Sequence, residues 1–108
     1  MLNHYQKNHK IDLKKFEKYI DKLRVMSHPV RFAILVMLTH RKKMTVTEIY
    51  EELSIQQAAA SNHLKTLKSH ELILSKKNGK NTNYFINNKT ISKLGRTLNL
   101  NQSENNKE

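Results

Sequence analysis

Apolar residues recur at helical spacing near the beginning of the chain. Four of them follow one another at intervals of three and four positions, with lysines between them: Leu13, Phe16, Ile20 and Leu23. This periodicity predicts an amphipathic helix from Ile11 to about Met26. Pro29 then suits the first turn of a second helix. Because residues 32–38 are almost continuously apolar, this second helix is predicted to be the central, buried one.

A capping box marks the next helix. Thr45 and Glu48 have the spacing in which a side-chain oxygen and a glutamate satisfy the first free N–H groups of a helix. The short helix that follows has three inward positions, namely Val46, Ile49 and Leu53. After a tight turn at residues 54–56, residues 57–69 form another predicted helix. Its inward positions are Ala60, Leu64 and Leu67.

The hydrophobic period changes after residue 71. Residues 72–74 and 82–86 are rich in residues that favour strands, and Asn78-Gly79 between them is a strong two-residue turn signal. A hairpin over residues 72–87 is therefore predicted. Residues 90–98 form a last helix with apolar positions on one side, namely Ile91, Leu94 and Leu98.

The predicted fold is mainly α with a small β-hairpin, an α+β winged helix-turn-helix. Four helices precede the hairpin, or wing, and a fifth follows it. A length of 108 residues is enough for one domain. We expect a flexible arm at residues 1–10, the winged domain at 11–98 and a disordered polar tail at 99–108.

The charge is strongly basic and unevenly distributed. Lysine and arginine number 20 against 9 acids, which gives a net charge of +11. Residues 45–71 carry 2 bases and 4 acids, whereas residues 72–96 carry 6 bases and no acid. Such an excess favours a polyanionic partner, with nucleic acid as the first candidate and an anionic membrane surface as the second.

Several function classes are disfavoured. The chain has no cysteine, which excludes disulfides and thiolate metal sites. It lacks an apolar run long enough to span a membrane and an apolar leader, so a cytoplasmic location without membrane association is expected. No nucleophile–base pair or phosphate-cradling glycine loop is present, and we expect neither enzymatic activity nor a cofactor.

Two short helices and a basic hairpin in this order predict binding to double-stranded DNA. Helix 57–69 can lie in the major groove, where glutamine and asparagine pair with adenine and alanine can touch a thymine methyl group. The outward side chains are Gln57, Ala58, Ser61, Asn62 and Lys65. The wing, which would lie on the backbone or in the minor groove, contributes phosphate contacts through Lys76, Lys77 and Lys80.

Three segments resemble the ArsR/SmtB family of winged helix-turn-helix regulators. Residues 23–35, LRVMSHPVRFAIL, resemble the family's opening signature. Residues 57–64, QAAASNHL, look like its recognition helix, and residues 72–84 match its wing in spacing. The resemblance covers about residues 12–98.

The resemblance implies a repressor that leaves its promoter when an inducer binds. It carries DNA-binding roles over to four positions, Gln57, Ser61, His63 and Lys80. Family members pair through their first and last helices. The two apolar stripes of this chain, on helices too short to be stable alone, predict the same homodimer. Its predicted interface comprises Leu13, Phe16, Ile20, Leu23, Ile91, Leu94 and Leu98. A two-fold dimer implies a palindromic operator.

The sequence departs from the family pattern at several positions. Gln56 replaces the usual serine cap of the recognition helix, and Glu71 stands where a glycine usually ends that helix, so strain is expected there. Metal-sensing members carry cysteines before the recognition helix, or His, Asp and Glu ligands on the last helix. Here residues 72–103 contain none of these ligands. No metal site is therefore predicted beyond a weak one at His4 and His9 of the arm, and we expect an organic inducer at the dimer interface or no inducer.

Two alternatives to a repressor remain. The chain resembles in composition an architectural DNA-binding protein without a sensor, which would not protect a short palindrome. Winged helices also serve as protein–protein modules, and binding insensitive to salt would indicate that role.

Overall fold

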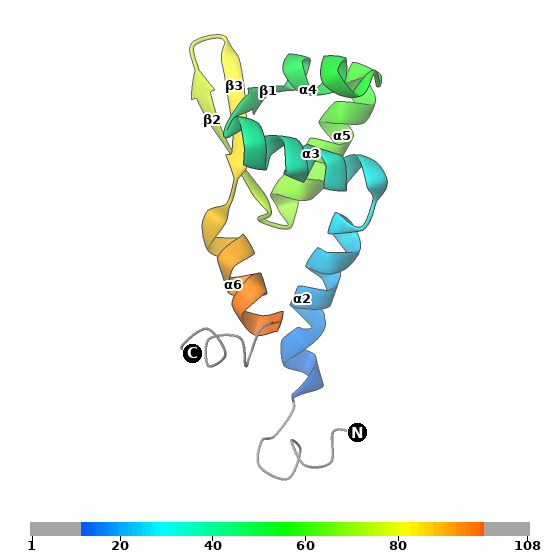
Figure 1. The fold of residues 1–108 in the computed structure, drawn as a ribbon, viewed down its shortest axis with the longest axis vertical. Helices are drawn as coiled ribbons and strands as arrows, with labels where there is room; N and C mark the ends of the chain where they lie inside the picture. Colours follow the sequence, from blue (N-terminus) through cyan, green and yellow to red (C-terminus); the bar gives the residue numbers. More distant parts are fainter. Residues whose placement is uncertain (1–11, 99–108) are drawn as a thin grey trace.

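A computed structural model describes residues 12–98, and the predicted arm (1–10) and tail (99–108) lie outside the described residues. Figure 1 shows a body of packed helices with a hairpin rising from it, while the first and last helices descend from the other end. The elements in chain order are α2 (Leu13–Met26), α3 (Pro29–Arg41), β1 (Met44–Thr45), α4 (Val46–Leu53), α5 (Gln57–Ser69), β2 (Ile73–Asn78), β3 (Asn81–Ile86) and α6 (Asn88–Leu98).

The first two described helices begin at side-chain caps. The carboxylate of Asp12 accepts a hydrogen bond from the backbone N–H of Lys14 at 3.1 Å, so α2 begins at Leu13 and not at Ile11. Nδ1 of His28 accepts from the N–H of Val30 at 3.2 Å, directly before α3. Both caps satisfy N–H groups that have no partner within the helix.

The prediction that α3 is buried on nearly all sides is wrong. Ile34, Leu35 and Leu38 are buried, but Phe32 is 53% exposed and Val36 is 40% exposed. The apolar run therefore has one face in the core and another that the described chain covers only in part. Within the described chain, α3 packs against α2, α5 and β3.

The helix-turn-helix unit is confirmed as predicted. The capping box is complete: Glu48 N–H donates to Oγ1 of Thr45 at 3.2 Å, and Thr45 N–H donates to Oε1 of Glu48 at 2.8 Å. Ser54 turns the chain with a left-handed backbone (φ 55°). Gln56 precedes α5 and makes no side-chain capping bond, as its poor capping ability leads one to expect.

The sheet has three strands, whereas a two-stranded hairpin was predicted. β2 and β3 pair around Asn78-Gly79, and Gly79 has a positive φ of 66° as the turn requires. The additional strand, β1, pairs antiparallel with β3, with Met44 opposite Tyr84, and the strand order is β1-β3-β2. Two residues are too few to show an alternating pattern, so β1 left no trace in the hydrophobic periodicity.

The last helix begins two residues earlier than predicted, at Asn88. The side chain of Asn87 ties its beginning to the end of α5. Its Nδ2 donates to the carbonyl of Glu71 at 3.0 Å, and its Oδ1 accepts from the N–H of Thr90 at 3.4 Å. This link fixes the direction in which α6 leaves the hairpin.

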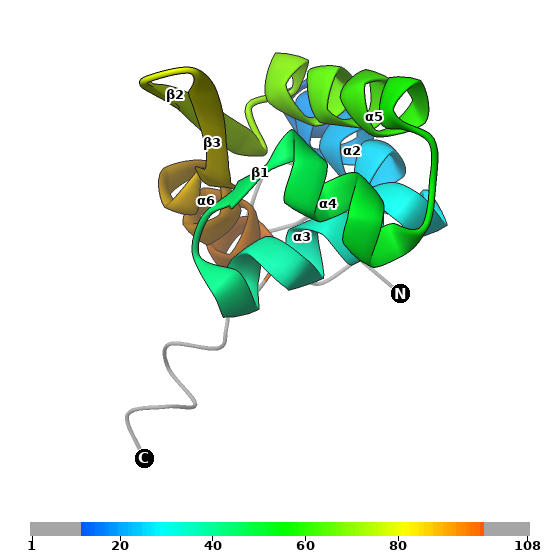
Figure 2. The same cartoon turned by 90° about the horizontal axis from the view of Figure 1, so that it is seen from above.

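One apolar core joins α3, α4, α5 and the base of the hairpin. Its fully buried side chains are Ile34, Leu38, Met44, Ile49, Leu64, Leu67, Leu72 and Ile73. Figure 2, the view from above, shows α5 along one side of the body and α3 along the other, with α4 between them. No helix within residues 12–98 is long and apolar enough to cross a membrane.

Candidate nucleic-acid interface

One side of α5 is fixed in the core while the other side is presented to solvent. Ala60, Leu64 and Leu67 are each at most 1% exposed and pack in the core with Ile49 of α4. Five of the predicted DNA-binding residues are exposed on the remaining face of this helix: Gln57, Ala58, Ser61, Asn62 and Lys65. The buried side thus sets the orientation in which α5 presents its polar side chains.

This exposed face has the groups that base edges require. The amides of Gln57 and Asn62 each combine a donor and an acceptor, as adenine does at its major-groove edge. The hydroxyl of Ser61 can donate or accept, and Lys65 offers a charge to phosphate. Because these residues lie in the first two and a half turns of α5, they would reach the groove floor before the end of the helix does.

His63 lies apart from the other predicted residues of α5. It is partly buried against the beginning of α3, where its Nδ1 lies 3.4 Å from Nη1 of Arg31 and its ring centroid is 4.7 Å from that of His28. Arg31 is held in turn by a 2.8 Å hydrogen bond from its Nε to the carbonyl of Val25. Desolvation, followed by the nearby His28 and Arg31, lowers the pKa of His63 below its usual value.

The cluster of His28, Arg31 and His63 was not predicted from the sequence. All three residues belong to the segments that carry the family resemblance, but spacing alone does not show that residues 28 and 63 meet. The cluster joins the beginning of α3 to the middle of α5. These contacts therefore help to hold α5 against α3.

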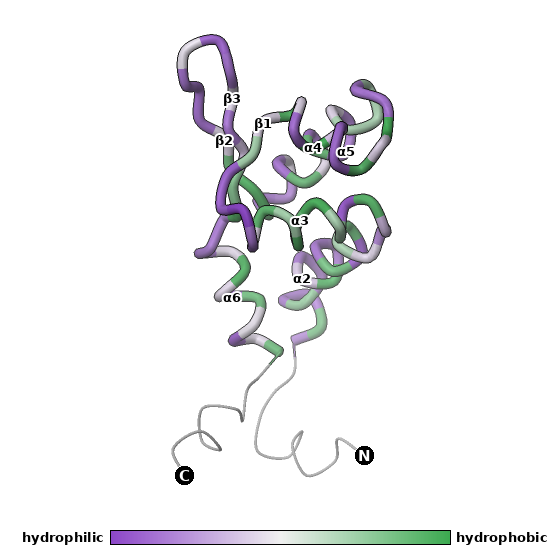
Figure 3. The backbone as a smooth tube through the Cα atoms, turned by 45° about the horizontal axis from the view of Figure 1, so that its top comes forward, coloured by the Kyte–Doolittle hydropathy of each residue, from purple (hydrophilic) through white to green (hydrophobic). Residues whose placement is uncertain are grey.

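The wing presents an exposed, basic tip. Lys76, Lys77 and Lys80 are all exposed, and no described acidic group forms an ion pair with any of them. Lys76 pairs in register with Asn83 and Lys77 with Thr82, so these two lysines point to opposite faces of the hairpin. Figure 3 shows the tip as a hydrophilic stretch of the backbone trace.

The predicted dimer residues divide into exposed and buried groups. Leu13, Ile20, Leu23 and Leu98 are exposed, whereas Phe16 and Ile91 are partly buried. Leu94 is only 4% exposed and is already buried within the chain. Phe32 and Val36 of α3 add exposed apolar area that the sequence analysis had assigned to the core. Figure 3 shows hydrophobic segments recurring along α2 and α6 where these helices leave the body.

Metal ligands are scattered in the described part of the chain. Within residues 12–98, no three His, Asp or Glu side chains lie close enough together to hold a metal ion. His4 and His9, the remaining candidates, lie outside the described residues.

A helix-turn-helix unit followed by a basic hairpin defines a class of protein, the winged helix-turn-helix. The sequence profile of a family described as "Helix-turn-helix domain" matches residues 26–75. "Transcriptional repressor PagR" of Bacillus anthracis is 29% identical over 92 residues, which cover 85% of this chain and 92% of PagR. The crystal structure of PagR superposes with a TM-score of 0.67 at 27% identity, covering 82% of this chain and all (100%) of that chain.

Two further relatives agree with this class. "Uncharacterized HTH-type transcriptional regulator MJ1325" of Methanocaldococcus jannaschii is 31% identical over 74 residues, which cover 68% of this chain and 83% of MJ1325. An "ArsR-like Transcriptional Regulator" from Rhodococcus sp. RHA1 has a TM-score of 0.72 at 22% identity, covers 87% of this chain and is itself covered to 88%. The chain belongs to the helix-turn-helix transcriptional regulators, a family of regulators and not of enzymes, and it shares the fold of an ArsR-like regulator.

Proposed function

We propose that this chain is a homodimeric transcriptional repressor that binds a palindromic operator in double-stranded DNA. The observation that carries the proposal is the two-sided character of α5: three buried side chains fix one side, and exposed Gln57, Ser61, Asn62 and Lys65 occupy the other. The name of its relative PagR, a transcriptional repressor, supports repression as the outcome of binding.

In this proposal α5 and the wing have different tasks. Gln57, Ala58, Ser61 and Asn62 contact base edges in the major groove and select the sequence. The wing lysines contact phosphates along the backbone or at the adjacent minor groove and add affinity without selecting bases. His63 is turned towards α3, where it contacts Arg31. It therefore contributes to DNA binding indirectly, by holding α5 in position.

The set of apolar side chains that remain exposed in the single chain supports a dimer. The exposed leucines and isoleucine of α2 and α6, together with Phe32 and Val36, are large apolar side chains that the single chain leaves open to solvent, and a partner would bury them. A two-fold axis through this surface would repeat α5 about 34 Å away, one turn of DNA. We expect the dimer to act in the cytoplasm, where its DNA is found.

Selection of bound duplexes from a random DNA library tests the proposal. The wild-type protein should enrich a short two-fold symmetric sequence, and its affinity for that sequence should fall steeply as salt is raised. Enrichment of no common sequence would indicate an architectural protein, and affinity unchanged by salt would contradict DNA binding altogether.

Two sets of variants separate the tasks of α5 and the wing. Gln57→Ala or Asn62→Ala should cost about 1–3 kcal/mol at the selected site and relax the base preference there. The triple variant Lys76→Gln, Lys77→Gln, Lys80→Gln should weaken binding to all sequences alike and lower the log–log salt slope by about 0.9 per lost phosphate contact. Unchanged selection by both α5 variants would mean that another surface reads the sequence.

A further inference from the structure

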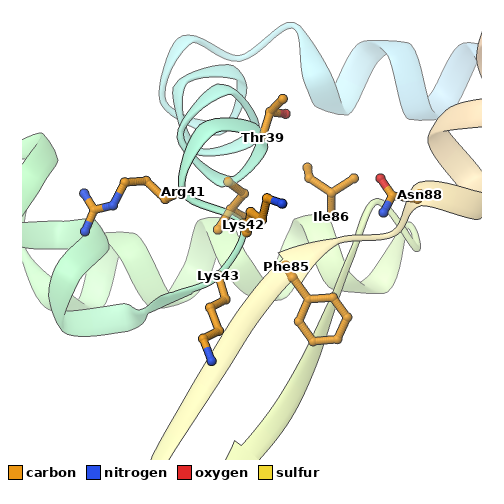
Figure 4. Close-up of a pocket in the computed structure, with 8 residues that line it drawn as sticks. Thr39, Arg41, Lys42, Lys43, Phe85, Ile86 and Asn88 are labelled. Carbon is orange, nitrogen blue, oxygen red and sulfur yellow. The ribbon is translucent and has the colours of Figure 1, made fainter.

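An open cleft of about 800 Å³ lies outside helices α4 and α5. It is lined by the end of α3, by strand β3 and by the beginning of α6, through Leu38, Thr39, Arg41, Lys42, Lys43, Phe85, Ile86 and Asn88. None of these residues belongs to α4 or α5. Figure 4 shows the cleft between the last turn of α3 and β3.

The lining combines an apolar wall with positive charge. Phe85 and Ile86 supply the apolar surface, and Leu38, only 1% exposed, lies behind it. In Figure 4 the Lys42 side chain extends towards Ile86 and Asn88, and Arg41 points away from them. Lys43 and Phe85 point to the other side of β3, so the two lysines flank its edge. Arg41 is engaged outside the cleft, where its guanidinium lies 3.2 Å from a carboxylate oxygen of Glu52.

The positive charge in the cleft has no counter-charge in the described structure. No acidic residue lines it, and the ion pairs of residues 12–98 include neither Lys42 nor Lys43. An apolar wall beside two free ammonium groups is complementary to an amphipathic anion, whose body would cover the wall while its acid group meets the lysines. A neutral or cationic ligand would not neutralise the charge of Lys42 and Lys43.

The backbone at Lys42 provides an independent observation. Lys42 has φ 70° and ψ −46°, a conformation that residues other than glycine rarely adopt. The turn is closed on both sides, because Lys42 N–H donates to the carbonyl of Leu38 at 2.9 Å and Lys43 N–H donates to that of Arg41 at 2.8 Å. Strained residues of this kind cluster at ligand sites, and here the strained residue is the lysine that extends into the cleft.

A smaller depression connects the cleft with the wing. Its volume is about 250 Å³, and it shares Lys43 and Phe85 with the cleft while Lys76 and Lys77 line its other end. A negative charge bound at Lys43 would therefore lie beside the lysines that the proposed function assigns to DNA phosphates.

We infer that the cleft binds a small amphipathic organic anion, such as a medium-chain carboxylate or an aromatic acid. The apolar body lies along the edge of β3 at Phe85 and Ile86, and the acid group lies between Lys42 and Lys43, whose side chains flank that edge (Figure 4). Binding itself is independent of DNA. Its consequence, weaker DNA binding because the anion opposes the charge of the wing, rests on the proposed function. The cleft shares no residue with the predicted dimer interface, where an organic inducer was expected.

Titration of the full chain with decanoate, followed by ¹⁵N–¹H NMR, tests the site directly. Chemical shifts should change saturably at the lining residues, among them Thr39, Lys42 and Asn88. Decanol, which has the same chain without the charge, should have a dissociation constant about tenfold higher. That factor of about ten corresponds to the usual free-energy contribution of a hydrogen bond to a charged group. Changes gathered instead on the exposed apolar side chains of α2 and α6, or equal binding of decanol, would overturn the inference.

Variants that keep the fold make the test specific. Lys42→Gly removes the ammonium group and suits the positive φ, so it retains the turn. Combined with Lys43→Gln, it should raise the dissociation constant of decanoate about tenfold or more. Phe85→Ala should raise it several-fold by removing part of the apolar wall. Lys68→Gln, which removes one positive charge from α5 outside the cleft, should leave it unchanged, and a comparable loss in this control would contradict a localised site.

The DNA arm of the experiment separates the two proposals. Decanoate should weaken DNA binding of the wild type several-fold and have little effect on the Lys42→Gly, Lys43→Gln variant. Failure of the protein to bind DNA at all would defeat the proposed function and leave the NMR result standing. Saturable binding in the cleft without any effect on DNA affinity would overturn the coupling to the wing.

Discussion

Glu71 occupies a backbone position suited to glycine. Its φ is 61°, at the end of α5, where the chain reverses into the wing. Glu71→Gly should raise the free energy of unfolding by about 0.5–1 kcal/mol, because relief of about 1–2 kcal/mol of left-handed strain exceeds the added entropy of glycine in the unfolded chain, about 0.4–1 kcal/mol. Urea denaturation measures the difference. Glu71→Ala keeps the strain and should show no comparable gain, and an equal gain would mean that the glutamate side chain, not the backbone, is unfavourable.

His63 makes the stability depend on pH in one direction. Its pKa in the folded protein lies below 6.5, mainly because of desolvation and then because of His28 and Arg31. Between pH 6.5 and the folded pKa, the imidazole is protonated in the unfolded chain but not in the folded chain. The contribution of neutral His63 to the free energy of unfolding is therefore lost as pH falls through 6.5 towards the folded pKa. His63→Gln should remove that loss. Urea midpoints of both proteins over a pH series check it, and parallel curves would contradict the assignment.

At the scale of elements, the capping box joins the sheet to the helix-turn-helix unit. Thr45 ends β1, opposite Asn83 of β3, and caps α4 at the same time. Thr45→Ala deletes the 3.2 Å hydrogen bond from the Glu48 N–H to Oγ1 and should cost about 1 kcal/mol of stability. Thr45→Ser retains the hydroxyl and should recover most of it. Denaturant unfolding distinguishes the two variants, and an equal loss in both would point to the missing methyl group instead of the cap.

At the scale of the whole molecule, the exposed apolar side chains of α2 decide the oligomeric state. Ile20 is 48% exposed in the single chain, so Ile20→Glu should leave the folded protomer intact while placing a charge in the proposed interface. We expect a monomer by sedimentation at micromolar concentration and much weaker operator binding. Lys18→Glu, on the opposite side of α2 by helical spacing, serves as the control and should remain dimeric. A dimer of Ile20→Glu would show that other residues form the interface.

The sequence predicted a structural feature correctly where the residues that produce it lie close together in the chain. The inward positions of α5, the capping box at Thr45 and the turn at Gly79 each depend on residues within a few positions of one another, and all were predicted correctly. The positive φ of Glu71 was expected from the family pattern and is confirmed. The DNA-reading roles of residues such as Gln57 remain predictions that the proposed experiments test.

The sequence by itself determined the order of the helices and the hairpin, the buried sides of α4 and α5 and the basic character of the wing, because periodicity, capping and charge are local properties. Only the tertiary structure decided which apolar residues enter the core: Phe32 and Val36 are as apolar as their neighbours, yet they stay 53% and 40% exposed. It also paired Met44 with Tyr84, and it brought the end of α3 to β3 to form the cleft. These features depend on contacts between segments far apart in the chain, and such contacts are set by the packing of the whole molecule.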